Sequence, residues 1–190
     1  MNKIKVVFLS LFLFSFSLNS FAQNKIEKDN TKKETKKVKK TDFKTLNWRA
    51  TSEDILKATT KKPKHKDNEK IVFDDNILGL EAEMTFFLTN NRFNKVKYDI
   101  KKKYNSNEEI LKDILKIKKD FNKNYGKPKS DSNPEIEVLP RDDYDKFLKA
   151  ILEQNQAIDI MWSKDYSEIK LNFKKSMLFF NDFSVTYSQI

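Results

Sequence analysis

The sequence predicts an α+β fold, in which an antiparallel sheet of about six strands packs against helices. Apolar and polar residues alternate from Glu83 to Ile100, which is typical of strands with one buried face. Between Ile110 and Tyr125 the apolar residues recur instead at helical spacing, and alternation returns after Ile158. With 38% hydrophobic residues, 16 Phe and only two Gly, the 190 residues are enough for one well-packed domain.

Residues 1–22 have the pattern of a secretory signal peptide. Two lysines precede an apolar run from Val6 to Leu18, and small residues provide a cleavage site after Ala22. Residues 23–42 are rich in lysine and lack an apolar face, so a disordered tether is expected. We therefore expect an exported protein, periplasmic or extracellular, with no transmembrane segment after cleavage and a single α+β domain at residues 43–190.

The first helix is predicted over residues 51–58. Thr51 is followed three residues later by Asp54, so that a hydroxyl and a carboxylate can cap the first turn. A polar connection leads from this helix to a short strand at 70–73. The next residues, Asp74–Asn76, have the composition of a turn.

A β-hairpin is predicted around residues 90–92. A turn of only Asn90 and Asn91 would place Phe86 opposite Lys95 and would reverse the apolar pattern of the second strand. A three-residue loop that includes Arg92 restores the pattern, with Phe86 opposite Val96, Met84 opposite Tyr98, and Ala82 opposite Ile100. One of the two Asn residues is expected in the left-handed conformation.

The clearest helix follows this hairpin. Ser106 and Glu109 form a second capping box, and Gly126 followed by Pro128 ends the helix. A third helix is predicted over residues 142–152, and three further strands are centred on Ile160, Leu171 and Val185.

The two halves of the sequence show the same order of elements. Helix 51–58 precedes three strands that end in VKYDI, and helix 142–152 precedes three strands that end in VTYSQI. This order suggests a tandem repeat of one helix and three strands, with the long helix between the copies. The alternative is that hairpins of similar composition simply look alike.

The net charge of +10 lies mostly outside the predicted domain. Two lysines belong to the signal peptide, residues 23–44 carry +5, and residues 45–190 carry +3 because 27 basic residues face 24 acidic ones. The basic residues are 35 Lys and three Arg, whereas nucleic-acid sites concentrate Arg. Specific nucleic-acid binding is therefore not expected, and the tether is expected to make at most weak contact with anionic surfaces.

Several spaced motifs occur together between Trp48 and Tyr187. They are W-x-x-[ST]-x-x-[DE]-[IV] from Trp48, the hairpin pattern F-x-x-x-N-N-R-F-x-x-V-x-Y, YGKP at 125–128, and Trp162 ahead of Ile169-x-Leu171. With these motifs the chain resembles a group of small exported bacterial α+β proteins of unassigned function, with a signal-peptide ending like those of Bacteroidota. It is more distantly similar to the SmpA/OmlA-type outer-membrane-assembly lipoproteins and to the β-lactamase inhibitor proteins.

The chain departs from these groups at two points. Arg49 stands where such proteins usually have Gly, and no Cys is present to carry a lipid anchor. The resemblance implies an α+β fold and brings no catalytic residues.

No motif indicates catalysis or the binding of a metal or cofactor. The chain has no Cys, no G-x-S-x-G, no H-E-x-x-H and no glycine-rich phosphate loop, and the single histidine, His65, lies between lysines. Asp74–Asp75 lacks the spacing of a calcium loop, and Asp142–Asp143 suits the start of a helix. We therefore predict a non-enzymatic protein without a cofactor, with a small carboxylate-dependent hydrolase as an alternative.

Five residues are predicted as an interaction surface: Phe87, Phe93, Lys95, Trp48 and Trp162. The two Phe are assigned to the hairpin face opposite Phe86, with Lys95 beside them. If exposed, they would form a patch for a protein partner, whereas the alternative is that a helix covers this face. The two Trp lie at ends of elements next to loops.

Together these features predict an exported, monomeric protein that binds or regulates another envelope or secreted protein. Binding would use the sheet face or the loop ends. Polyanion or cell-surface binding through the lysine-rich tether is one alternative, and a pocket lined by two or more acids would instead favour the hydrolase.

Overall fold

A computed structural model describes residues 46–154, 156–175 and 181–190, which belong to one compact unit. The predicted signal peptide at 1–22 and the tether at 23–42 lie outside the described residues.

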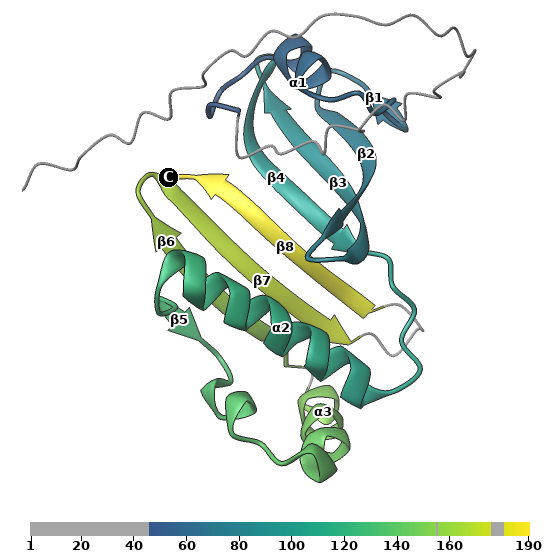
Figure 1. Ribbon diagram of the computed structural model, residues 1–190, viewed down its shortest axis with the longest axis vertical. Coiled ribbons are helices and arrows are strands. Elements are labelled where there is room, and N and C mark those ends of the chain that lie inside the picture. Colours follow the sequence, from purple (N-terminus) through teal and green to yellow (C-terminus); the bar gives the residue numbers. More distant parts are fainter. Residues whose placement is uncertain (1–45, 155, 176–180) are drawn as a thin grey trace, which may run out of the picture. The chain divides into compact units, whose positions relative to one another are not determined.

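The strands form one antiparallel sheet of eight, in the order β1-β2-β3-β4-β8-β7-β6-β5 (Figure 1). They are β1 (His65–Lys66), β2 (Lys70–Ile77), β3 (Leu80–Thr89), β4 (Arg92–Ile100), β5 (Ser130–Asp131), β6 (Ile158–Lys164), β7 (Ser167–Lys175) and β8 (Asn181–Gln189). The α+β class is confirmed, but the prediction of about six strands was wrong. It lacked β1 and β5, which have two residues each and are too short to show an alternating pattern.

The strand order is symmetric about the pair β4–β8. Val96 pairs with Tyr187, and Tyr98 pairs with Val185. The VKY and VTY triplets therefore lie side by side in opposite directions at the centre of the sheet, and we call this boundary the seam.

The two halves continue this symmetry away from the seam. Phe86 of β3 pairs with Ile71 of β2, and Leu171 of β7 pairs with Ile160 of β6. Each half also begins with an α-helix followed by a two-residue edge strand, because α1 (Ser52–Ala58) precedes β1 and α2 (Asn107–Tyr125) precedes β5. The element that corresponds to α1 is thus α2, and α3 (Tyr144–Glu153) stands between β5 and β6 without a counterpart.

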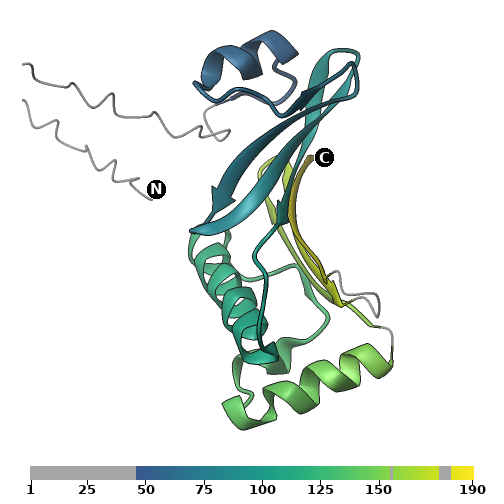
Figure 2. The ribbon, with the colours of Figure 1, turned by 90° about the vertical axis from the view of Figure 1, so that its right-hand side faces the viewer.

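One hydrophobic core joins the helices to one face of the sheet. It contains Ile55 of α1, Leu111 of α2 and Leu148 of α3 together with the inward residues of β2 to β4 and β6 to β8. Figure 2 shows α1 and α2 on the same side of the sheet. The opposite face is not covered by any helix among the described residues, so each long strand has one buried and one more polar side.

The register predicted for the β3–β4 hairpin is confirmed, but the predicted three-residue loop was wrong. The strands are joined by the two-residue turn Asn90–Asn91, and both residues are left-handed, with φ of 51° and 60°. The register shifts where Phe87 pairs with Lys95 while Leu88 pairs with Phe93, which leaves Asn94 as the extra residue of a β-bulge. The bulge thus supplies the offset that the longer loop was expected to supply.

The turn predicted at Asp74–Asn76 was also wrong. These residues lie within β2, which continues to Ile77 and is joined to β3 by Leu78–Gly79. Lysines neutralise the acidic pair, since Lys64 Nζ lies 2.9 Å from Asp74 and Lys61 Nζ lies 2.6 Å from Asp75. These ion pairs allow a sequence with turn composition to extend as a strand near the sheet edge.

Most of the capping hydrogen bonds predicted for the first two helices are present. At α1 the Thr51 hydroxyl accepts from the Asp54 amide, and the Asp54 carboxylate accepts from the Thr51 amide, as in a capping box. At α2 the Ser106 hydroxyl accepts from the Glu109 amide at 3.2 Å, but the Glu109 carboxylate accepts from Asn105 instead of Ser106. α3 begins two residues later than predicted, after the 3-10 turns Pro134–Glu137 and Arg141–Asp143.

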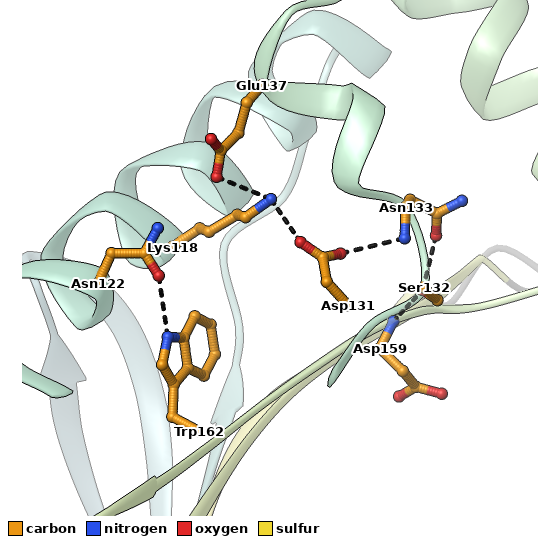
Figure 3. Close-up of polar contacts among 8 residues, drawn as sticks. All are labelled: Lys118, Asn122, Asp131, Ser132, Asn133, Glu137, Asp159 and Trp162. Carbon is orange, nitrogen blue, oxygen red and sulfur yellow. Dashed lines mark hydrogen bonds and ion pairs between the residues drawn. The ribbon is translucent and has the colours of Figure 1, made fainter. Parts of the chain in front are cut away.

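Two polar contacts tie α2 to the second half of the sheet (Figure 3). Asn122 Oδ1 accepts a hydrogen bond of 2.9 Å from Trp162 Nε1 on β6. One turn earlier, Lys118 Nζ lies 2.6 Å from Asp131 and 2.8 Å from Glu137, although its side chain is only 3% exposed. These contacts place α2 over β5 and β6.

α2 ends at Gly126, as predicted, and this glycine has φ 84° and ψ −165°. That conformation is nearly confined to glycine, and a Cβ would meet no atom within 4 Å. The cost of a side chain at this position therefore comes from the backbone conformation and not from a steric clash.

Gly126→Ala is expected to lower the free energy of unfolding by about 1–3 kcal/mol, measured by urea denaturation. Lys127→Ala, at an exposed neighbouring position, is the control and should change it by less than about 0.5 kcal/mol. Equal midpoints for both variants would contradict this account of the helix end.

Candidate functional site

The seam opens at one end, where β4 and β8 separate. Their pairing runs only from Lys95 to Asp99 on β4. Beyond it, the chain ahead of α1 bonds to β4, since the Arg49 amide donates to the Phe93 carbonyl at 3.0 Å and the Phe93 amide donates to the Ala50 carbonyl at 3.1 Å. This segment therefore takes up the edge of β4 where the pairing with β8 ends, one residue before β8 itself ends at Gln189.

A cavity of about 240 Å³ lies at this opening, and we call it the aromatic pocket. Its lining residues are Leu46, Trp48, Phe93, Tyr125, Ser167, Ile169 and Tyr187, together with Lys164 and Asp165 at the β6–β7 turn. These residues come from the segment ahead of α1, from β4, from the end of α2, and from β7 and β8. No single stretch of sequence could build it.

Trp48 forms one wall of the aromatic pocket and is held at both edges. Its ring lies 5.3 Å from that of Phe93, and its Nε1 donates a hydrogen bond of 2.9 Å to Ser167 Oγ. The next residue, Arg49, is left-handed, with φ 70°. The turn at Arg49 lets Trp48 reach β7 while the following backbone pairs with β4.

The opposite wall contains two tyrosines that pack on Phe121 of α2. The ring of Phe121 lies 5.5 Å from Tyr125 and 6.2 Å from Tyr187. Burial, with a smaller contribution from Tyr125, holds the pKa of Tyr187 well above its usual value, so this phenol is neutral at physiological pH. The wall therefore offers mainly aromatic surface, and Tyr187 adds no charge to it.

A more polar groove adjoins the aromatic pocket, and Phe93 lines both. This arginine groove, of about 640 Å³, is also lined by Arg49, Asn90, Arg92, Asn94 and Gln189. Arg92 Nη1 donates to the Arg49 carbonyl at 3.0 Å, which holds Arg92 against the segment ahead of α1. The groove lining carries the two guanidinium groups and, at Ile190, the terminal carboxylate of the sequence.

The five residues predicted as an interaction surface separate into three environments. Trp48 and Phe93 meet in the aromatic pocket, so the assignment of Phe93 to the face opposite Phe86 was wrong. The bulge at Asn94 turns Phe93 inward, and its ring packs edge-on against Phe86 at 5.4 Å. Trp162 is fully buried beneath α2, because β6 runs under that helix, so its placement on a surface was also wrong.

Phe87 and Lys95 lie on the uncovered face of the sheet. Lys95 Nζ is 4.2 Å from the centre of the half-buried Phe87 ring, a cation–π contact. Much of the charge nearby is already paired, with Lys97 at 2.7 Å from Asp99 and Lys170 at 3.2 Å from Asp159. On this part of the face, charged side chains therefore pair with one another.

The remaining predicted candidates show no catalytic arrangement. His65 lies on β1, where its Nε2 is 2.6 Å from Asp67, and this bond together with the Glu69 and Lys70 amides lowers the pKa of Asp67 to about 2. Neither cavity is lined by more than one carboxylate. In the part of the chain that the structure describes, no three His, Asp or Glu residues are grouped as metal ligands, and no helix has the length and apolarity needed to cross a membrane.

Tyr125, Ser167 and Tyr187 line the aromatic pocket but were not among the predicted site residues. Their spacing marks them only as parts of a helix and of two strands. Comparison of the chain with protein-family models, with curated proteins and with solved structures found no match.

Proposed function

We propose that this protein is an exported binding module that captures another envelope or secreted protein, and that the aromatic pocket receives one apolar side chain of that partner. The observation that carries the proposal is the pocket itself. Its walls are largely aromatic and aliphatic, with Lys164 and Asp165 at the β6–β7 turn. The indole N–H of Trp48 is already satisfied by Ser167, so an apolar group can enter without leaving that donor unpaired.

The size of the aromatic pocket favours a side chain over a cofactor. Sites for drug-sized ligands and cofactors usually have volumes of about 300–1,000 Å³. At about 240 Å³, this pocket is smaller, yet it holds several times the volume of one water molecule. Protein interfaces commonly place a single aromatic or aliphatic anchor in a pocket of this kind.

The acidic groups support binding over hydrolysis. A glycosidase mechanism needs two carboxyl groups about 5–10 Å apart across a substrate site. Among the lining residues, Asp165 is the one acidic side chain of the aromatic pocket, and the arginine groove has only the terminal carboxylate of Ile190. Asp74 and Asp75, both on β2, are instead ion-paired with Lys64 and Lys61 and line neither cavity.

Trp48→Ala is expected to weaken capture of the partner by at least about 2 kcal/mol, or roughly thirtyfold, because it removes one wall of the pocket. The exported protein, tagged and immobilised, would be exposed to envelope extract and secreted proteins of its own organism, and bound proteins would be quantified by mass spectrometry. Thermal unfolding would confirm that the variant is folded.

Phe87→Ala is the matched control, since it removes a half-buried ring from the uncovered face. A partner that depends on Trp48 and not on Phe87 supports the proposal. A partner lost with Phe87→Ala but retained with Trp48→Ala would place binding on the uncovered face and contradict the role of the pocket.

A further inference from the structure

We propose that the partner segment carries an acidic residue beside its apolar anchor, and that Arg49 and Arg92 bind this carboxylate in the arginine groove. This inference rests on the proposed function, because it names the chemistry of the segment that the aromatic pocket receives.

The pocket and the groove form neighbouring parts of one surface. Phe93 lines both cavities, and Arg49 follows Trp48 directly in the chain. A residue adjacent to a side chain inserted in the pocket therefore lies within reach of the groove, since consecutive Cα atoms are about 3.8 Å apart.

The two arginines are not in ion pairs with any described residue, although the protein is rich in acidic groups. Arg92 donates one bond to the Arg49 carbonyl, and the Arg49 guanidinium has no hydrogen bond to the described residues. Asp54 is near enough for Arg92 to contribute slightly to lowering its pKa, but hydrogen bonds with Thr51 hold that carboxylate at the start of α1. Ile190, the last residue of the sequence, also lines the groove, but its carboxylate is not ion-paired with either arginine, so both guanidinium groups can bind a carboxylate from a partner.

Arginine is rare in this sequence, and most of it lies at this groove. The chain has 35 Lys and three Arg, and two of the three Arg line this groove. Arginine binds carboxylates through a planar pair of N–H donors, whereas lysine acts as a point charge. A groove that only attracted negative charge could have used lysine, so the arginines favour a defined carboxylate.

The groove also offers groups that can bind a peptide backbone. Asn90, Asn94 and Gln189 carry amides with both donors and acceptors. Asn94 is the extra residue of the β-bulge, and its side-chain amide already donates one hydrogen bond of 3.2 Å to Thr89 Oγ1. An extended segment with an apolar anchor and adjacent acidic residue would match the apolar, cationic and amide parts of this surface.

The test uses four peptides with acetylated and amidated ends: Asp-Asp-Phe-Asp-Asp, its Asn counterpart Asn-Asn-Phe-Asn-Asn, its Lys counterpart, and Asp-Asp-Gly-Asp-Asp. They are titrated into the ¹⁵N-labelled exported protein and followed by NMR. The chain has only two Trp, so the indole resonance of Trp48 reports on the pocket and that of the buried Trp162 serves as an internal reference.

We expect the Asp–Phe peptide to shift the Trp48 indole resonance and to bind about tenfold more tightly than the Asn–Phe peptide at low salt. Arg49→Gln should reduce binding of the Asp–Phe peptide by about fivefold and leave the Asn–Phe peptide unaffected. Lys149→Gln removes the same charge from an exposed position on α3 and should have no effect.

The outcomes separate the two proposals. Equal binding of the Asp–Phe and Asn–Phe peptides at Trp48, or tighter binding of the Lys peptide, overturns the acidic preference and leaves the pocket intact as a site. Equal binding of the Gly and Phe peptides, or no shift at Trp48 with any peptide, shows that the pocket takes no side chain and overturns both. An equal loss with Arg49→Gln and Lys149→Gln shows only general charge attraction and overturns the role of the groove.

Discussion

Trp162→Ala is expected to lower the free energy of unfolding by about 3–5 kcal/mol, measured by urea denaturation monitored by circular dichroism. The Trp162 side chain is 0% exposed and packs edge-on against Phe121 of α2, with ring centres 5.2 Å apart. Its removal leaves a cavity between α2 and β6 and deprives Asn122 of its hydrogen-bond donor. The loss therefore combines a packing defect with an unsatisfied polar group.

Two other variants help to separate the contributions to this loss of stability. Trp162→Phe keeps most of the apolar volume but removes the N–H, and should cost about 1–2 kcal/mol. Trp48→Ala removes the same residue type from a half-buried position and should destabilise less than Trp162→Ala. If Trp162→Ala left the unfolding midpoint unchanged, Trp162 would be a surface residue, as the sequence pattern suggested.

Lys118→Ala is expected to destabilise the fold by about 3–5 kcal/mol, because it leaves two carboxylates without their cation. Lys118 is 3% exposed, and Asp131, one of the two, is only 11% exposed. The substitution should loosen β5 and the following 3-10 turn from α2 (Figure 3). Hydrogen exchange at β5 and urea denaturation would measure the local and the global effect.

Lys112→Ala provides a matched control on the same helix. Lys112 also forms an ion pair, 2.7 Å from Glu108, but both side chains are well exposed, so its loss should change stability by less than about 0.5 kcal/mol. Lys118→Met with Asp131→Asn removes both buried charges and should recover part of the loss. Similar stabilities for Lys118→Ala and Lys112→Ala would show that the buried pair contributes no more than a surface pair.

The contribution of Lys118 should persist through neutral pH. Burial opposes its charge, but hydrogen bonds to Asp131 and Glu137 outweigh burial and raise the pKa above its ordinary value of 10.5. Since the folded state holds this proton more tightly than the unfolded state, the stabilisation is present below pH 10.5 and is lost as pH rises through the higher folded value.

Local chemistry in the sequence determined the classes of element and several of their ends. The cap at Thr51 and Asp54 and the glycine stop at Gly126 depend on residues within one turn of each other, so no distant contact is needed to predict them. The alternation along β3 and β4 likewise determined their pairing, because a shift of one residue would expose the apolar face.

Tertiary structure decided the features that depend on contacts between distant elements. Two-residue strands at the sheet edges have no pattern of their own and exist only because β2 and β6 offer them partners. The bulge at Asn94 changes the face on which Phe93 lies without any local mark in the sequence. Trp162 is buried because α2 lies over β6. Its hydrogen-bond partner on α2, Asn122, is 40 residues earlier in the chain.

Of the candidate site, sequence reasoning found Trp48 and Phe93 as aromatic candidates, but it placed Phe93 on the wrong face and could not bring the two together. The pocket exists because β4 and β8 separate at one end of the seam and the segment ahead of α1 enters the opening. Its lining comes from residues as far apart as Trp48 and Ser167, whose contact spans 119 positions of the chain. Periodicity reports only which side of its own element a residue faces, so a cavity formed where several elements meet is decided by their packing.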